Sequence, residues 1–235
     1  MLDLPEPVAR YLRRVLPDSP PRIAAVILHQ CGELRASTRT RHWLPFTASE
    51  RITTNPPSFV WDARITLPLG LRLCVHDEYA AGVGAGRVSL VGLPLSGERG
   101  RPELNEGALH RYLAESPWYP TALLPRGGLS WMPIDERAAR AVLTDRGITI
   151  SLDFRFDQND EVCGIFSPGR WRKLVGQYRR TAWEGRFSRY ELRSGMRIPV
   201  HGEVGWYESQ RYGSQRWEPV WRGTIRAADY RCMPA

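Results

Sequence analysis

The stretch "ITISLDFRF", Ile148–Phe156, alternates apolar and polar side chains over nine consecutive residues. Successive side chains of a β-strand point to opposite faces of a sheet, so this period of two predicts a strand with one buried and one solvated face. One-sided strands of this kind are typical of antiparallel sheets. The buried face would carry Ile148, Ile150, Leu152, Phe154 and Phe156.

The same period of two recurs along most of the chain. Further strands are predicted at about 22–35, 43–55, 58–67, 71–81, 86–93, 137–144, 160–167, 183–192, 196–208 and 217–229. Several are separated by "TDRG", "DQND" or "RSGM", which suit tight hairpins. The expected fold is mainly β (α+β): a curved antiparallel sheet, or half-barrel meander, of ten or more strands. No repeat or long polar linker divides residues 1–235, so a single domain is expected.

Two interruptions of the strand period are predicted to cover the concave face of this sheet. Residues 5–16 form an amphipathic helix, and 17–21 form a proline-rich connector to the first strands at 22–93. A loop from residue 94 leads to a second helix with Asn105 as its N-cap. An aromatic, proline-rich plug follows, so that loop, helix and plug span 94–128 and the second set of strands spans 129–235.

The plug is the sequence "ESPWYPTALLP", Glu115–Pro125, and it has two interpretations. Two short helices cannot easily fill the apolar face of ten or more strands, so part of that face could line a cavity. Trp118 and Tyr119 would then lie at the mouth or floor of the cavity, held by flanking prolines that limit the entropy lost on ordering. Alternatively, the plug is an ordinary part of the core. The sequence leaves both interpretations open.

The net charge of +8 is concentrated in the C-terminal third of the chain. Residues 162–235 carry 14 cations and 6 acids, whereas residues 1–161 carry 19 of each. Lys173 is the only lysine, a bias that needs no phosphate partner to explain it. The densest cationic segment is "RWRKLVGQYRR", Arg170–Arg180.

The segment 170–180 is interpreted first as a solvated loop with exposed arginines. The alternative is an anion-binding patch that meets a membrane or an acidic partner, with Arg170, Arg172, Arg179 and Arg180 as its candidates. Nucleic acid is not the expected partner.

The cysteines and the N-terminal sequence bear on cofactors and location. Four cysteines are scattered without CxxC spacing or clustered histidines, so we expect neither a metal site nor a cofactor. The first residues lack the apolar run of a signal peptide, which favours a cytoplasmic protein with reduced cysteines. The oligomeric state is not indicated.

Six segments carry a resemblance that extends over nearly the whole chain: "LPEPVARYLRRVLP", "RHWLPFTASE", "FVWDARI", "YLAESPWYPTALLP", "WEGRFSRYE" and "GMRIPVHGEVGWY". Together they resemble an uncharacterised bacterial family known as a domain of unknown function, which implies no activity. The strand–helix–strand plan is also similar to the half-barrel of periplasmic lipoprotein carriers, which implies binding of acyl chains. The same half-barrel occurs in a cofactor-free enzyme of violacein biosynthesis, which keeps a catalytic function open.

The favoured hypothesis is that the half-barrel binds an apolar or amphipathic, lipid-like small molecule in an aromatic-lined cavity. Candidate lining residues are large and fall on apolar strand faces or on the plug. They are Trp61, Tyr79, Tyr112, Trp118, Tyr119, Trp131, Phe154 and Trp206.

Two other hypotheses remain. The chain could be a cofactor-independent enzyme, of isomerase, cyclase or lyase type, that acts on a hydrophobic metabolite in the same cavity. Asp77 falls on an otherwise apolar strand face and is the acid/base candidate, with the Tyr119 hydroxyl second, whereas His201 and Glu203 fall on a polar face. Alternatively, the basic C-terminal third is an interaction module.

Overall fold

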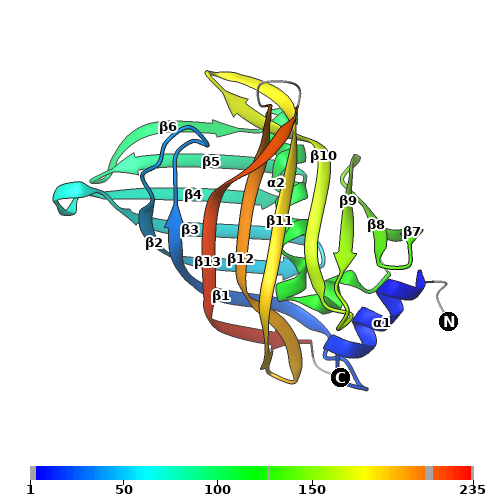
Figure 1. Cartoon of the computed structure of the whole chain (residues 1–235). Helices are drawn as coiled ribbons and strands as arrows, with labels where there is room; N and C mark the ends of the chain where they lie inside the picture. The colour runs from blue at the N-terminus through cyan, green and yellow to red at the C-terminus, as the bar shows by residue number, and fades with distance from the viewer. Residues whose placement is uncertain (1–3, 126–127, 210–213, 234–235) are drawn as a thin grey trace.

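The computed structural model describes residues 4–125, 128–209 and 214–233. Its β-strands form one curved sheet of thirteen strands in which every neighbouring pair is antiparallel (Figure 1). The fold is therefore mainly β, as the period of two predicted. The strands are β1 Ile23–Leu34, β2 Leu44–Thr54, β3 Pro57–Thr66, β4 Arg72–Ala80, β5 Val83–Leu90, β6 Leu93–Arg99, β7 Leu129–Asp135, β8 Ala138–Asp145, β9 Ile148–Phe156, β10 Val162–Leu174, β11 Gln177–Arg193, β12 Met196–Ser209 and β13 Gln215–Cys232.

The strand order explains how the plug reaches the concave face. The order is β6-β5-β4-β3-β2-β1-β13-β12-β11-β10-β9-β8-β7, so the first and last strands pair in the middle and β6 and β7 are the two edges. The chain must cross from one edge to the other between β6 and β7. It does so as the helix α2, Pro102–Ala114, and two short 3₁₀ helices, Ser116–Trp118 and Pro120–Leu123. Because α2 contacts β3, β4 and β5 on one side and β9 and β10 on the other, it lies inside the curve of the sheet.

The N-terminal helix α1, Glu6–Val15, covers another part of the same face. Pro7 lies in its first turn, where a missing N–H is tolerated. Val8, Tyr11 and Val15 on its apolar stripe are almost fully buried, and the helix contacts β8 and β12. The predicted helix at 5–16 is confirmed to within a residue at each end. Within the described part of the chain, no helix has the length and apolarity to span a bilayer.

The boundaries around the first edge of the sheet differ from the prediction. The segment 94–104 was expected to be a loop, but β6 occupies Leu93–Arg99, and β5 begins at Val83 rather than at 86. The helix begins at Pro102, so Asn105 lies inside its first turn and is not the N-cap. The Asn105 side chain instead accepts a hydrogen bond from the backbone N–H of Gly84 at 2.8 Å, which ties α2 to β5. At the other edge, β7 was not predicted.

The basic segment 170–180 is a hairpin and not a solvated loop. It joins β10 and β11 and reaches across to the opposite half of the sheet. Lys173 forms an ion pair with Glu98 of β6 at 2.7 Å, and Tyr178 donates to the same carboxylate at 2.7 Å. Arg180 forms an ion pair with Glu106 of α2 at 2.9 Å. The loop prediction failed because the partners of this segment lie on elements 74 to 80 residues earlier in the chain.

Candidate functional site

The concave face of the sheet retains a cavity of about 330 Å³ that the helices do not fill. Its wall is built from α2, from the first residues of the plug and from strands of both halves of the sheet. Six of the nine tryptophans of the chain line it, together with six charged residues. The tryptophans are Trp61, Trp118, Trp171, Trp183, Trp206 and Trp221, and the charged residues are Arg35, Asp77, Arg111, Glu115, Arg170 and Glu203.

Four of these tryptophans are each covered by an arginine. The guanidinium carbon lies 4.4 to 5.1 Å from the ring centroid in the pairs Arg111–Trp61, Arg170–Trp183, Arg172–Trp206 and Arg180–Trp171. At such distances the cation is attracted to the π face of the ring. The stacks hold large aromatic side chains in fixed positions and so make the wall rigid.

The other two tryptophans pack on each other over a row of glycines. The ring centroids of Trp118 and Trp221 are 6.4 Å apart. Below them Gly32 of β1, Gly223 of β13 and Gly202 of β12 are paired across three strands. A Cβ on Gly223 would lie 2.5 Å from the Trp221 ring, and one on Gly32 would lie 2.1 Å from a backbone oxygen of β13. Glycine is therefore required here, since any side chain would displace the ring or the neighbouring strand.

Arg111 is the centre of the polar part of the site. Its three guanidinium nitrogens each reach a different carboxylate: Nε to Glu115 at 2.8 Å, Nη1 to Asp77 at 3.1 Å and Nη2 to Glu50 at 3.2 Å. The three acids come from the end of α2, from β4 and from β2. Burial opposes the charged guanidinium, but Glu115, Glu50 and Asp77 together raise the pKa of Arg111 above its ordinary value. Arg111 is thus a fixed cation at neutral pH.

Glu50 is the deepest member of this cluster. Its side chain has no exposed surface, and it accepts a hydrogen bond from the amide nitrogen of Gln30 at 2.8 Å. The Gln30 oxygen in turn accepts from the indole N–H of Trp61 at 2.9 Å, so the cluster is continuous with the tryptophan wall. Burial, followed by the neighbouring charge of Glu115, raises the pKa of Glu50 well above its ordinary value. Burial and the nearby charge thus favour the protonated form of Glu50.

Asp77 lies on the cavity wall, where strand parity placed it. Its carboxylate is half-buried and pairs with Arg111. Burial raises the pKa of Asp77, and the charge of Arg111 opposes part of that rise. Asp77 therefore has an ion-pair partner and also a raised pKa.

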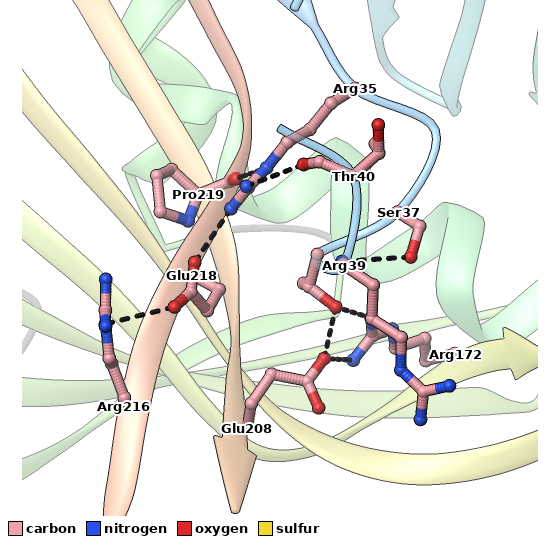
Figure 2. Close-up of polar contacts among 10 residues, drawn as sticks. Arg35, Ser37, Arg39, Thr40, Arg172, Glu208, Arg216, Glu218 and Pro219 are labelled. Atoms are coloured by element: carbon pink, nitrogen blue, oxygen red, sulfur yellow. Dashed lines mark hydrogen bonds and ion pairs between the residues drawn. The ribbon is translucent and has the colours of Figure 1, made fainter. Parts of the chain in front are cut away.

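Arg35 fastens the loop 35–43, between β1 and β2, to the far wall of the cavity. It donates to the Glu218 carboxylate at 2.9 Å and to the backbone oxygens of Pro219 at 2.5 Å and Thr40 at 3.0 Å (Figure 2). Glu218 and Pro219 belong to β13, so the loop is held against the middle of the sheet.

A second contact fastens the same loop to the basic hairpin. Arg172 donates to Glu208 at 2.7 Å and to the Thr38 hydroxyl at 2.9 Å, and Thr38 donates to Glu208 at 2.5 Å (Figure 2). Because Arg172 also covers Trp206, this triangle supports one of the cavity tryptophans from behind. Arg172 is paired within the protein through these contacts and is not free to bind an external anion.

The four predicted anion-binding arginines do not form one patch. Arg170 lines the cavity, Arg172 is buried in its triangle, and Arg180 pairs with Glu106. Arg179 is exposed. The hairpin therefore offers no continuous array of free cations.

The structure places the predicted ligand-lining residues in two groups. Trp61, Trp118 and Trp206 line the cavity. Tyr119, which was also the second catalytic candidate, lies in the core: it is fully buried and its hydroxyl donates to the backbone oxygen of Tyr112. The plug is thus divided, with Trp118 on the cavity and Tyr119 beneath it.

The remaining four predicted lining residues also lie in the core and not on this cavity. Tyr79 is fully buried and donates to Asp145 at 2.6 Å. Tyr112 packs on the Tyr119 ring at 5.7 Å, and Trp131 packs on Phe154 at 5.1 Å. These four residues were predicted as cavity lining because they are large and fall on apolar faces. In the structure, α2 and the plug cover most of the apolar face of the sheet.

Sequence reasoning missed the residues that organise the site. Arg111 and Glu115 lie at helical spacing of four on α2, and Glu50 lies at an inward position of β2. The alternation of β2 contained the signal for Glu50, because it placed a carboxylate on a buried face. The alternation of β4 did the same for Asp77. Glu203, assigned by parity to a polar face, is among the lining residues. The described residues contain no group of three or more His, Cys, Asp or Glu side chains arranged to hold a metal ion.

Comparison with known proteins identifies the family. Residues 2–230 match a family of unknown function, DUF6920, and the chain therefore belongs to that family. Among curated proteins, none matches the sequence. A solved structure, the LolA superfamily protein NE2245 from Nitrosomonas europaea, is similar over 97% of this chain and 93% of its own, with 11% identity and a TM-score of 0.41. A likeness of this degree carries no argument about the fold or the ligand of this chain.

Proposed function

We propose that this member of a family of unknown function binds an apolar or amphipathic small molecule in the tryptophan-lined cavity. The observation that carries the proposal is the cavity itself, about 330 Å³ walled by six tryptophans on the concave face. Ligand sites are commonly concave and mostly apolar, with a few polar groups that fix the orientation of the ligand. Arg111, Asp77 and Glu115 supply such groups at one place on the wall.

The volume limits what the cavity can hold. It lies at the small end of the range of about 300–1,000 Å³ that is typical of ligand sites. One alkyl chain or one fused ring system fits that range, whereas a lipid with two acyl chains does not. The arginine–tryptophan stacks favour a preformed site, because they fix the aromatic side chains of the wall.

A second candidate function is catalysis without a cofactor on the same hydrophobic molecule. The observation that favours it is Asp77, a carboxylate on the cavity wall whose pKa is raised by burial. A carboxyl group with a raised pKa exchanges protons closer to neutral pH and is suited to acid/base work. In this reading the product forms only while Asp77 is present, and Asp77→Asn removes turnover but leaves binding in place.

The binding proposal is tested with an apolar fluorescent probe and a substitution that fills the cavity. Val220 lines the cavity, and Val220→Trp would add an indole to it. Overpacking costs about 1–3 kcal/mol, so the probe is expected to bind about tenfold more weakly or worse, since each 1.4 kcal/mol is about tenfold. The same substitution at the fully exposed Val175, on a hairpin tip, is the matched control and should bind as the wild type does. Equal binding by both variants, or no binding by the wild type, contradicts the proposal.

A further inference from the structure

One arginine on the cavity wall lacks a carboxylate partner. Within residues 4–125, 128–209 and 214–233, Arg35 pairs with Glu218 and Arg111 pairs with three acids, but no carboxylate lies within ion-pair distance of Arg170. One Nη of Arg170 donates to the backbone oxygen of Gly107 at 3.1 Å. Its Nε is buried and has no hydrogen-bond partner in the described structure.

Trp118 provides a second unpaired donor on the same wall. Its side chain is only 3% exposed, and no acceptor among the described residues receives its indole N–H. Buried donors are normally paired, and leaving one unpaired costs about 1–3 kcal/mol. One oxygen of Glu115 also has no hydrogen-bond partner among the described residues. Two of these three unpaired atoms on the wall are donors, so the larger unmet demand is for an acceptor.

We propose that Arg170 and Trp118 bind the carboxylate of an amphipathic acid whose apolar part occupies the tryptophan-lined cavity. This inference rests on the proposed function and adds the head group of the ligand. A planar carboxylate matches the guanidinium fork and carries the single charge that Arg170 can neutralise. A doubly charged phosphate would add repulsion from Asp77 and Glu115, which line the same wall.

The test compares two single-chain ligands that differ only in their head group. Dodecanoate and dodecanol are titrated into the protein while tryptophan fluorescence is followed. A hydrogen bond to a charged group is worth about 1.5–3 kcal/mol, so dodecanoate is expected to bind about 10- to 100-fold more tightly than dodecanol. In Arg170→Gln this preference, taken as the ratio of the two affinities, is expected to disappear. In Trp118→Phe, which keeps an aromatic ring, the preference falls by about tenfold or less.

Controls separate the failure of this inference from the failure of the proposed function. Arg179 is exposed, so Arg179→Gln should retain the full preference. If both ligands bind the wild type equally, or if Arg170→Gln keeps the preference, the head-group assignment is overturned and the cavity proposal stands. If neither ligand nor the apolar probe binds, the proposed function itself fails. Thermal unfolding of each variant shows whether a loss of binding reflects a loss of folding.

A different surface carries a second, independent inference. The β3–β4 and β5–β6 turns lie side by side at one end of the sheet (Figure 1), since the backbone N–H of Val91 donates to Arg72 at 3.3 Å. Their large apolar side chains are exposed by 44 to 99%: Leu69, Leu71, Val91, Leu93 and Leu95. Monomeric proteins rarely expose such a contiguous apolar group without a partner.

The charge around these turns identifies the kind of partner. Segments 67–76 and 87–97 contain Arg72 and Arg87 and no acidic residue. We infer that these two turns dock on an anionic lipid surface, with the leucines entering the interface and the arginines facing the head groups.

Sedimentation with phosphatidylglycerol-containing vesicles tests this docking surface. The wild type is expected to sediment with the vesicles, and the double variant Leu69→Ser, Leu93→Ser to bind at least about tenfold more weakly, because each buried CH₂ contributes about 0.8 kcal/mol. Val175→Ser and Leu192→Ser change exposed side chains elsewhere, on the β10–β11 turn and near the end of β11, and should bind as the wild type does. A wild-type protein that stays in the supernatant, or that instead forms a dimer broken by the double variant, overturns the inference.

Discussion

Replacing Arg111 with methionine is expected to cause a loss in the free energy of unfolding of about 3–5 kcal/mol at neutral pH, because one partner of a buried ion pair is removed. Three carboxylates lose their shared cation, and Glu50, which has no exposed surface, forms no ion pair with another cation among the described residues. The Arg111 guanidinium also covers the Phe59 and Trp61 rings, and methionine keeps an unbranched side chain beside them, so most of the loss reports the charge. Chemical denaturation followed by fluorescence measures it.

Three variants show whether the Arg111 cluster causes this loss. Arg140 forms an exposed ion pair with Asp153, so Arg140→Met should cost at most about 1 kcal/mol. The loss in unfolding free energy for Arg111→Lys should fall between those for Arg140→Met and Arg111→Met, because an ammonium group cannot reach three carboxylates in one plane. Adding Glu50→Gln to Arg111→Met should restore part of the stability, since it removes the stranded charge. An Arg111→Met protein as stable as Arg140→Met would contradict the role assigned to Arg111.

The second large effect is a pH dependence of stability that disappears in Glu50→Gln. Burial and the charge of Glu115 raise the pKa of Glu50 in the folded protein. The folded state therefore holds a proton that the unfolded state releases, and stability must fall as pH rises between the two pKa values. The contribution is complete below the unfolded carboxyl pKa, about 4.3, and is lost above the folded one. The slope reaches about 1.4 kcal/mol per pH unit for one proton.

The measurement is the difference in unfolding free energy between Glu50→Gln and the wild type from pH 4 to pH 8. A neutral amide mimics the protonated carboxyl, so the variant is expected to gain relative to the wild type as pH rises. The groups that face Glu50 are Arg111, Glu115 and Gln30, and all three are retained in the variant. The pKa of Asp77 is also raised by burial. Asp77 therefore lowers the unfolding free energy with rising pH in both proteins, and its effect cancels in the difference. Parallel curves would show that Glu50 carries no proton on folding.

The sheet could be predicted because its determinants are local. In β9 each side chain either faces the core or faces water, and the alternation of "ITISLDFRF" records this directly. Edge strand β6 escaped prediction because an edge has little to bury, and both Leu93 and Leu95 remain exposed. The N-cap of α2 was placed four residues late, at Asn105 instead of Arg101, because Asn105 resembles a cap although its side chain bonds to β5.

Residues of the site could be predicted only where strand parity alone determines which face a side chain occupies. Asp77 was found because a carboxylate on an apolar strand face requires an explanation. Its partner Arg111 could not be found, since the two meet only when α2 crosses the concave face. Phe154 and Trp206 look equivalent in the alternation, yet α2 contacts β9 and leaves Trp206 on the cavity. Which part of an apolar face stays open depends on the path of the crossing segment.

Native mass spectrometry of gently purified protein, followed by solvent extraction of anything released, shows whether the tryptophan-lined cavity holds a ligand. We expect one amphipathic, single-chain or single-ring molecule bound per protein chain, and the extract should contain a carboxylic acid. A protein mass without any adduct, together with no uptake of an apolar probe or dodecanoate by the wild type, would contradict it. The tryptophan-lined cavity would then be a feature of the core and not a binding site.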